Sequence, residues 1–314
     1  MPIDAKLQAI LDAGKALGRP PVEQQTPAEA RAERAEMMAR FVPMPEYRSV
    51  KTEDRTIGAD GRKIPVRIYT PARDGPFAVV VFFHGGGWVV GTLETHDPYC
   101  RALATEAGAV VVSVDYRLAP EHKFPAGLED SLAATEWVLE HVGELGGDAS
   151  QVIAGGDSAG ATMATVVALL LRDKGVTGLA GQILLYPVTA YYDPPTASYV
   201  ENAEGYGLTR NGMIWFWDNY LNDKAEAKDF RVAPLFAPSL AGLPRAFVVT
   251  AEYDVLRDEG QAYAKRLAEA AVAVTHVFVE GMNHGFAASP NEFPFLPQAK
   301  DMLRRVAEWV KAGR

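Results

Sequence analysis

A series of short apolar runs, each bounded by turn residues, constrains the fold of this chain more than any other feature. The runs are 77–83, 109–116, 151–156, 181–187, 245–251 and 274–280. Continuous apolarity with many β-branched residues is typical of strands buried on both faces of a parallel sheet. Helix-like stretches separate several of the runs, at 93–107, 127–145, 159–174, 258–271 and 298–312. The alternation predicts an α/β fold with a mostly parallel central sheet flanked by helices.

Two segments depart from this alternation, 1–45 and 188–244. Both are rich in helix-like stretches, which are 3–17, 27–41 and 211–220. Strand-like stretches at 48–58 and 63–70 precede the alternating region. Ligands of open α/β sheets bind at the carboxyl ends of the strands. We therefore expect 1–45 and 188–244 to form a helical cap over that edge, and 46–187 and 245–314 to form the two parts of the core.

Composition excludes several classes of protein. With 31 Lys and Arg against 40 Asp and Glu, the net charge is −9, so a nucleic-acid partner is not expected. Cys100 is the single cysteine, which excludes an intrachain disulfide and a cysteine-rich zinc site. Asp4 and Lys6 interrupt the apolar stretch that an export signal needs, and no run is long and apolar enough for a membrane span. We expect a cytoplasmic protein without a membrane partner.

The pentapeptide Gly156-Asp157-Ser158-Ala159-Gly160 lies between the apolar run 151–156 and the helix-like stretch that follows. G-x-S-x-G in this position is the nucleophile elbow, a strained strand-to-helix turn that exposes a serine hydroxyl. Its glycines are needed because side chains there would collide with the adjacent strand and helix. An ordinary capping turn before a helix is the alternative interpretation. We predict that Ser158 is a nucleophile.

A second motif, HGGGW at 84–88, directly follows the run 77–83. Three consecutive glycines are entropically expensive to order, which indicates that the backbone itself is used. Such a loop supplies N–H groups to an oxyanion hole, together with the residue after the nucleophile. The predicted donors are Gly86, Gly87 and Ala159. A plain flexible loop is the alternative.

A serine nucleophile needs a base, and the base needs an orienting carboxylate. His284 directly follows the run 274–280, and His122 is its only serious rival among the six histidines. Asp254 follows the run 245–251 and is preferred over Glu252. The resulting order is Ser158, Asp254, His284, as the elbow motif requires.

Taken together, these motifs resemble those of the bacterial hormone-sensitive-lipase-like esterases of the α/β-hydrolase superfamily. The resemblance spans 48–312 and rests on HGGGW, YRLAPEHKFPA at 116–126, GDSAG, YDVLRDEG and NHGF. It implies an α/β-hydrolase fold with a helical cap and a serine carboxylesterase that forms an acyl-enzyme and needs neither metal nor cofactor. The family usually has glycine after GDSAG, where this chain has Ala161; a helix start favours alanine there.

The resemblance further implies a small-molecule ester substrate with a short or medium acyl chain. Trp88, Trp215 and Phe216 are candidate substrate contacts, although these aromatic residues could equally anchor the cap. Two alternatives on the same fold remain: an amidase or peptidase with this triad, and a receptor that binds a small molecule without catalysis. The sequence is also compatible with a homo-oligomer.

Overall fold

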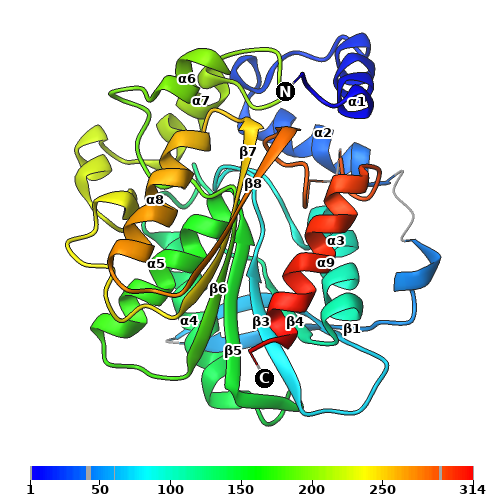
Figure 1. The fold of residues 1–314 in the computed structure, drawn as a ribbon, viewed down its shortest axis with the longest axis vertical. Helices are drawn as coiled ribbons and strands as arrows, with labels where there is room; N and C mark the ends of the chain where they lie inside the picture. Colours follow the sequence, from blue (N-terminus) through cyan, green and yellow to red (C-terminus); the bar gives the residue numbers. More distant parts are fainter. Residues whose placement is uncertain (1, 40–43, 60, 290–291, 314) are drawn as a thin grey trace.

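The computed structural model describes residues 2–39, 44–59, 61–289 and 292–313. A sheet ordered β1-β2-β4-β3-β5-β6-β7-β8 forms its centre (Figure 1). The strands are β1 (Lys51–Ala59), β2 (Arg62–Thr70), β3 (Phe77–Phe83), β4 (Val110–Val114), β5 (Gly147–Asp157), β6 (Leu179–Leu185), β7 (Arg245–Tyr253) and β8 (Val274–Asn283). β2 is antiparallel to β1 and β4, while the remaining pairs from β4 to β8 are parallel. The predicted mostly parallel sheet is confirmed.

Helices connect the strands and extend the chain beyond the sheet. They are α1 (Ala5–Ala16), α2 (Pro27–Ala39), α3 (Leu93–Ala107), α4 (Ala126–His141), α5 (Ala159–Asp173), α6 (Ala197–Glu201), α7 (Arg210–Tyr220), α8 (Arg257–Glu269) and α9 (Pro297–Lys311). Short 3₁₀ helices lie at Val22–Gln24, Pro45–Tyr47, Lys224–Lys228 and Pro234–Phe236. None of the helices in the described residues is long and apolar enough to cross a lipid bilayer.

The core has two apolar layers, one on each face of the sheet. Side chains of β3 alternate between them: Val79 and Val81 pack toward α4, α5 and α8, whereas Val80 and Phe82 pack toward α3 and α9. Figure 1 shows these two groups of helices on opposite sides of the sheet. Every residue of β3 is buried, which explains why its sequence is continuously apolar.

Most predicted elements begin and end close to their expected positions, but α4 is shorter than the predicted helix at 127–145. It ends at His141. A tight turn follows, in which Gly146 has a φ of 66° and the N–H of Gly147 donates to the carbonyl of Val142 at 2.8 Å. The glycines at 143 and 146 therefore end the helix. The expected helix at 27–41 is observed as far as Ala39, and its last two positions lie outside the described residues.

Helices α1, α2, α6 and α7 lie beyond the carboxyl ends of β7 and β8, at the top of Figure 1. The start of α1 is attached to the core, because the N–H of Asp4 donates to the carbonyl of Gly281 at 3.0 Å. The Asp4 carboxylate also caps α1 by accepting from the N–H groups of Lys6 and Leu7. This attachment positions the amino-terminal helices at the carboxyl edge of the sheet, where substrates of such folds bind.

A buried carboxyl group joins α8 to the segment that follows β6. The Glu259 Oε1 atom accepts the N–H groups of Thr189 at 2.7 Å and Ala190 at 3.0 Å. The side chain is only 1% exposed. Burial raises the pKa of Glu259 to about 8, although the two N–H donors favour the ionised form. The folded protein therefore holds a proton here that the unfolded chain releases.

We expect this proton to make stability depend on pH. Between the ordinary pKa of 4.5 and about 8, the folded state binds more protons at Glu259 than the unfolded state does, so the free energy of unfolding falls as pH rises. Glu259→Gln keeps the acceptor oxygen and removes the proton equilibrium. Urea denaturation at several pH values should therefore give a flatter profile for this variant. Glu269→Gln, which changes an exposed carboxylate of the same helix, should keep the wild-type slope. Equal slopes for Glu259→Gln and the wild type would contradict the prediction.

Candidate active site

Ser158 lies at the sharp turn between β5 and α5. Its backbone has φ 52° and ψ −122°, a left-handed conformation that is uncommon for residues other than glycine. The Ser158 N–H donates to the carbonyl of Leu185 at the end of β6, at 2.8 Å. The turn is thus fixed to the neighbouring strand, and the serine is held at the carboxyl edge of the sheet.

The glycines of the motif are required by the close approach of backbone on either side of the turn. A Cβ atom at Gly160 would overlap the carbonyl oxygen of Phe83 on β3, and one at Gly156 would overlap the backbone of Gly160. Neither atom could move without displacing a strand or the start of α5. The flanking glycines therefore allow α5 to begin directly beside the central strand.

Three side chains from distant parts of the sequence form a continuous hydrogen-bonded row. His284 Nε2 lies 2.9 Å from Ser158 Oγ, and His284 Nδ1 lies 2.8 Å from Asp254 Oδ2. Asp254 follows β7 and His284 follows β8, so parallel neighbouring strands bring both to one edge. A carboxylate only accepts hydrogen bonds, so Nδ1 donates to Asp254 and Nε2 accepts from the serine hydroxyl. This tautomer can remove the serine proton.

The carboxylate in this row is held rigidly. The Asp254 side chain is 1% exposed, and its Oδ1 atom accepts the N–H of Leu256 at 2.8 Å. The Asn202 side chain donates to the backbone carbonyl of Asp254 at 3.0 Å. On the other side, the edge of the Tyr186 ring packs against the ring of His284, with centroids 4.7 Å apart. Both the acid and the imidazole therefore have one preferred orientation.

The two rivals from the sequence lie elsewhere. Glu252 accepts the N–H of Gly281 at 2.7 Å and makes no contact with His284. His122 is exposed, in the loop before α4. The structure therefore places Asp254 and His284, and not Glu252 and His122, in the row with Ser158.

The glycine loop after β3 lies beside the serine. Gly86 and Gly87 have φ values of 117° and 58°, conformations that favour glycine. In the part of the chain that the structure describes, the N–H groups of Gly86, Gly87 and Ala159 donate no hydrogen bond. These donors are therefore available to a ligand. Gly86 and Gly87 line the same cavity as Ser158 and His284.

Asp157 is a functional element that our sequence analysis missed. Its Oδ1 atom accepts the N–H of Gly85 at 2.8 Å and lies 3.0 Å from His96 Nε2. Burial acts to raise the pKa of Asp157, but His96 and the Gly85 N–H outweigh it and lower the pKa below its ordinary value. The Asp157 carboxylate thereby joins the glycine loop to the elbow. The sequence did contain a signal for this contact, because a carboxylate such as Asp157 in an apolar turn needs a hydrogen-bond or ion-pair partner when it is buried.

The loop at 116–126 supports the glycine loop from behind. The hydroxyl of Tyr116 donates to the carbonyl of His84 at 2.7 Å. The two rings stack with centroids 4.4 Å apart. Burial lowers the pKa of His84 to about 3, so this histidine stays neutral. His84 is therefore a packing residue.

A cavity of about 850 Å³ opens onto the serine hydroxyl. Its floor is formed by the elbow, the glycine loop and the loop after β8. Its walls come from α1, the 3₁₀ helix Val22–Gln24, α2 and the segment after β6, through residues that include Leu11, Glu23, Arg34, Met37, Met213 and Phe216. Segments that are distant in sequence thus enclose the row of hydrogen-bonded residues.

Among the three aromatic residues predicted to contact substrate, only Phe216 lines this cavity. Its ring lies so close to the glycine loop that a Cβ atom at Gly87 would overlap it. Trp88 is buried and stacks on Tyr220, with ring centroids 4.2 Å apart. Trp215 donates its indole N–H to the carbonyl of Gln25 at 3.1 Å. Trp88 and Trp215 do not line this cavity, and their contacts agree with the alternative interpretation, in which these residues anchor the surrounding helices.

Metal-binding side chains do not cluster in the described residues, where no group of three or more His, Cys, Asp or Glu could hold an ion. Cys100 is buried in α3, and burial raises the pKa of its thiol. A neutral, buried thiol is a poor nucleophile. Cys100 therefore offers no alternative nucleophile to the serine.

Comparison with known proteins agrees with this geometry. A sequence model of the α/β-hydrolase fold family matches residues 80–288, more than half of the chain. The chain therefore belongs to the α/β-hydrolase family. It is 46% identical over 249 residues to the carboxylesterase NlhH of Mycobacterium tuberculosis, covering 77% of this chain and 76% of that protein. It is 37% identical over 233 residues to an ethyl acetate hydrolase of Pseudomonas putida, covering 72% of each.

A solved structure gives the same result. A thermostable esterase from Pseudomonas putida ECU1011 superposes with a TM-score of 0.94 at 40% identity, covering 99% of this chain and 98% of that chain. Within the family, the chain is a hormone-sensitive-lipase-like carboxylic ester hydrolase.

Proposed function

We propose that Ser158, His284 and Asp254 are the catalytic triad of this esterase. The observation that carries the proposal is the unbroken row of two hydrogen bonds, 2.9 Å from Ser158 Oγ to His284 Nε2 and 2.8 Å from His284 Nδ1 to Asp254 Oδ2. A serine hydroxyl is a weak nucleophile until a base removes its proton. The row supplies that base in the correct tautomer, with the carboxylate placed to stabilise the imidazolium that forms.

The reaction proceeds in two half-reactions. Ser158 Oγ attacks the ester carbonyl while His284 takes the hydroxyl proton, and a tetrahedral oxyanion forms. The C–O bond to the alcohol then breaks, and His284 returns the proton to the departing alcohol oxygen. A water molecule next attacks the acyl-enzyme, with His284 as its base, and the carboxylic acid leaves as Ser158 recovers its proton.

We propose that the N–H groups of Gly86, Gly87 and Ala159 bind the oxyanion. Two properties support this. The three groups donate no hydrogen bond among the described residues, and Ala159 directly follows Ser158 while Gly86 and Gly87 line the same cavity as Ser158. Amides fixed in place need no reorganisation when the charge develops, and each typically contributes about 3 to 4 kcal/mol to the transition state. Asp157 fixes the first N–H of the glycine loop and so limits its movement.

We also propose that residues 1–45 and 188–244 act together as a cap on the core formed by 46–187 and 245–314. Residues from both segments line the cavity around Ser158, including Leu11 and Phe216. The single cysteine is compatible with action in the reducing cytoplasm.

The proposed substrates are esters with short to medium acyl chains. A cavity of about 850 Å³ has room for a small ester and part of an acyl chain, and it is walled by both cap segments. The name of the Pseudomonas putida relative, an ethyl acetate hydrolase, agrees with a small substrate.

We expect kcat/KM on p-nitrophenyl esters to be highest between acetate and octanoate and to fall steeply toward palmitate, because the cap walls limit the length of a bound chain. A series from acetate to palmitate, measured below the solubility limit of each ester, checks this. Emulsified triolein and dissolved tributyrin provide a second comparison. Higher activity on the long-chain emulsion than on the butyrate ester would show that the enzyme is a true lipase and would contradict the proposal.

A further inference from the structure

Two polar groups of the active-site cavity take no part in the chemistry described above. Arg34 lies on α2, and Glu292 lies in the segment between the loop of His284 and α9. Both line the cavity that contains Ser158 and His284. Ester hydrolysis itself needs neither a guanidinium nor a further carboxyl group. An unpaired guanidinium on the wall of this cavity therefore calls for a role in binding.

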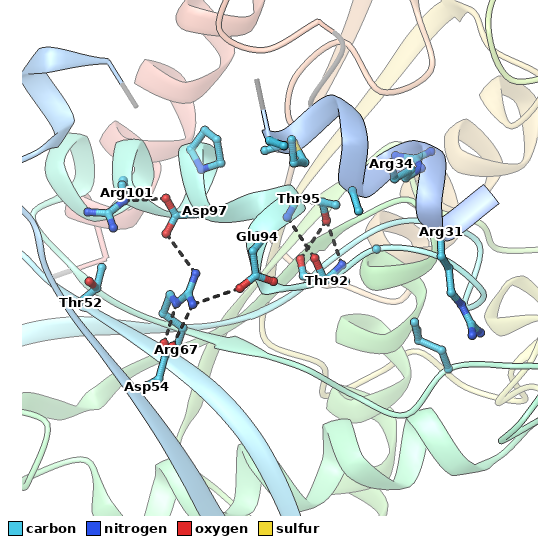
Figure 2. Close-up of a pocket in the computed structure, with 16 residues that line it drawn as sticks. Arg31, Arg34, Thr52, Asp54, Arg67, Thr92, Glu94, Thr95, Asp97 and Arg101 are labelled. Atoms are coloured by element: carbon cyan, nitrogen blue, oxygen red, sulfur yellow. Dashed lines mark hydrogen bonds and ion pairs between the residues drawn. The ribbon is translucent and has the colours of Figure 1, made fainter. Parts of the chain in front are cut away.

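Arg34 differs from the other arginines around it because it has no partner within the described residues. Arg19, at the mouth of the same cavity, pairs with Glu33 at 3.2 Å. Arg34 also borders a neighbouring cavity of about 750 Å³, which Figure 2 shows. There Arg67 pairs with Asp54 and Asp97, whereas no interaction is drawn to Arg34. Arg34 is thus a cation that a ligand could neutralise.

Three acidic groups act on the charge of Arg34, first Glu292 and then Asp157 and Glu33, and none of them forms an ion pair with it in the described residues. Glu33 accepts from Arg19 and from the side chain of Gln25. Asp157 holds the N–H of Gly85. Arg34 is half-buried, and burial lowers the pKa of its guanidinium despite the carboxylates in its surroundings. A cation that loses hydration without a compensating contact gains most from an incoming anion.

Glu292 is the remaining acidic group near Arg34. Its side chain is 5% exposed, and the Ser289 side chain is a hydrogen-bond partner of its carboxyl group. The Oε1 atom accepts from the side chain of Asn283 at 3.5 Å. Burial raises the pKa of Glu292, although the hydrogen bonds from Ser289 and Asn283 and the positive charge of Arg34 act to lower it. The Glu292 carboxyl is thus engaged with Ser289 and Asn283, and it forms no ion pair with Arg34 in the described residues.

We propose that Arg34 binds a carboxylate of the substrate and that the enzyme therefore acts on anionic esters. The guanidinium fork matches the two oxygens of a carboxylate, which a lysine would not do. The protein carries a net charge of −9, so an anion is not attracted by the overall field and must be recognised by a local group. The carboxylate can belong to the acyl part, as in a monoester of a dicarboxylic acid, or to the alcohol part, as in an acylated hydroxy acid. This inference rests on the proposed function, because Ser158 must act on the bound ester.

Two matched pairs of esters test the proposal. Mono-p-nitrophenyl glutarate and p-nitrophenyl valerate differ by a carboxylate on the acyl side, and 2-acetoxypropanoate and 2-acetoxypropanamide differ by one on the alcohol side. We expect Arg34→Gln to lower kcat/KM for the anionic member of at least one pair by about tenfold or more, because a charge-assisted hydrogen bond is lost. The neutral members should change by less than about threefold. The pair that responds identifies the side on which the carboxylate binds.

Two control variants test whether the effect of Arg34→Gln comes from lost recognition of the carboxylate, from misfolding or from the loss of a positive charge in the cavity. Arg34→Lys keeps the charge and loses the fork, so it should recover part of the activity on the anionic ester; it also carries the test if Arg34→Gln fails to fold. Arg19→Gln removes an equal charge from the same cavity and should not alter the preference between pair members. Equal losses on anionic and neutral esters, no loss on either, or the same selective loss in Arg19→Gln would each overturn the proposal. Turnover of the neutral esters by the wild type and its loss in Ser158→Ala test the proposed function separately.

Discussion

Ser158→Ala should lower kcat on p-nitrophenyl butyrate by about 10⁴-fold or more while the protein remains folded. The substitution removes only the nucleophilic oxygen. The turn is held by backbone contacts, including the hydrogen bond from the Ser158 N–H to the carbonyl of Leu185, and alanine keeps them. Release of p-nitrophenol measures the loss of activity, and the thermal midpoint measures folding. The residual rate should reflect oxyanion binding alone.

A covalent probe makes the same test independent of turnover. An organophosphate transfers its phosphoryl group to an activated serine, so intact-protein mass spectrometry should show one adduct on the wild type and none on Ser158→Ala. Labelling at another site, or wild-type turnover in the variant, would contradict the assignment of the nucleophile. Failure of the wild type to react would favour a binding protein on this fold.

Asp254→Asn should cost about 10⁴-fold in kcat, although it changes a single atom of the carboxyl group. The structure fixes which way the new amide points. The position of Oδ1 faces the N–H of Leu256 and must hold an acceptor, so the amide oxygen takes that place and the NH₂ group faces His284 Nδ1. The imidazole must then carry its proton on Nε2, where it can no longer accept the proton of Ser158. The variant should fold normally, because every hydrogen bond of the carboxyl group is replaced.

Glu252→Gln is the matched control for this prediction. Glu252 lies at the end of the same strand, two residues before Asp254, and accepts the N–H of Gly281. Glutamine can accept the same bond, so kcat should stay within about twofold of the wild type. A larger loss in Glu252→Gln than in Asp254→Asn would transfer the role of orienting acid to Glu252 and would overturn the triad as proposed.

The elements and the row of hydrogen bonds follow from local signals in the sequence. The predicted helix at 93–107 has the bounds observed for α3, because Thr92 caps its start and Gly108 takes the left-handed conformation at its end. Ser158, Asp254 and His284 each directly follow a parallel strand of the sheet. Parallel strands place such positions at one edge, so sequence order and strand identity suffice to bring them together.

The cavity walls could not be predicted in this way. Which side of α7 faces the serine depends on how the helix rests on Trp88, and Trp88 stacks on Tyr220 of that helix. Phe216 consequently lines the cavity, while the adjacent Trp215 contacts Gln25 instead. No periodicity in the segment 188–244 distinguishes these neighbours. That Arg34 has no ion-pair partner among the described residues likewise becomes visible only once the positions of the surrounding carboxylates are known.

The contact between Phe216 and Gly87 links the wall of the cavity to the loop that stabilises charge. Because a Cβ atom at position 87 would overlap the ring, the two positions cannot vary independently. A smaller side chain at Phe216 would enlarge the acyl site, but it would also remove packing against Gly87, a proposed oxyanion donor. A broader substrate range would therefore come with slower turnover, unless another contact holds the glycine loop in place. Libraries for altered specificity should therefore vary both positions together and leave the serine, histidine and aspartate unchanged.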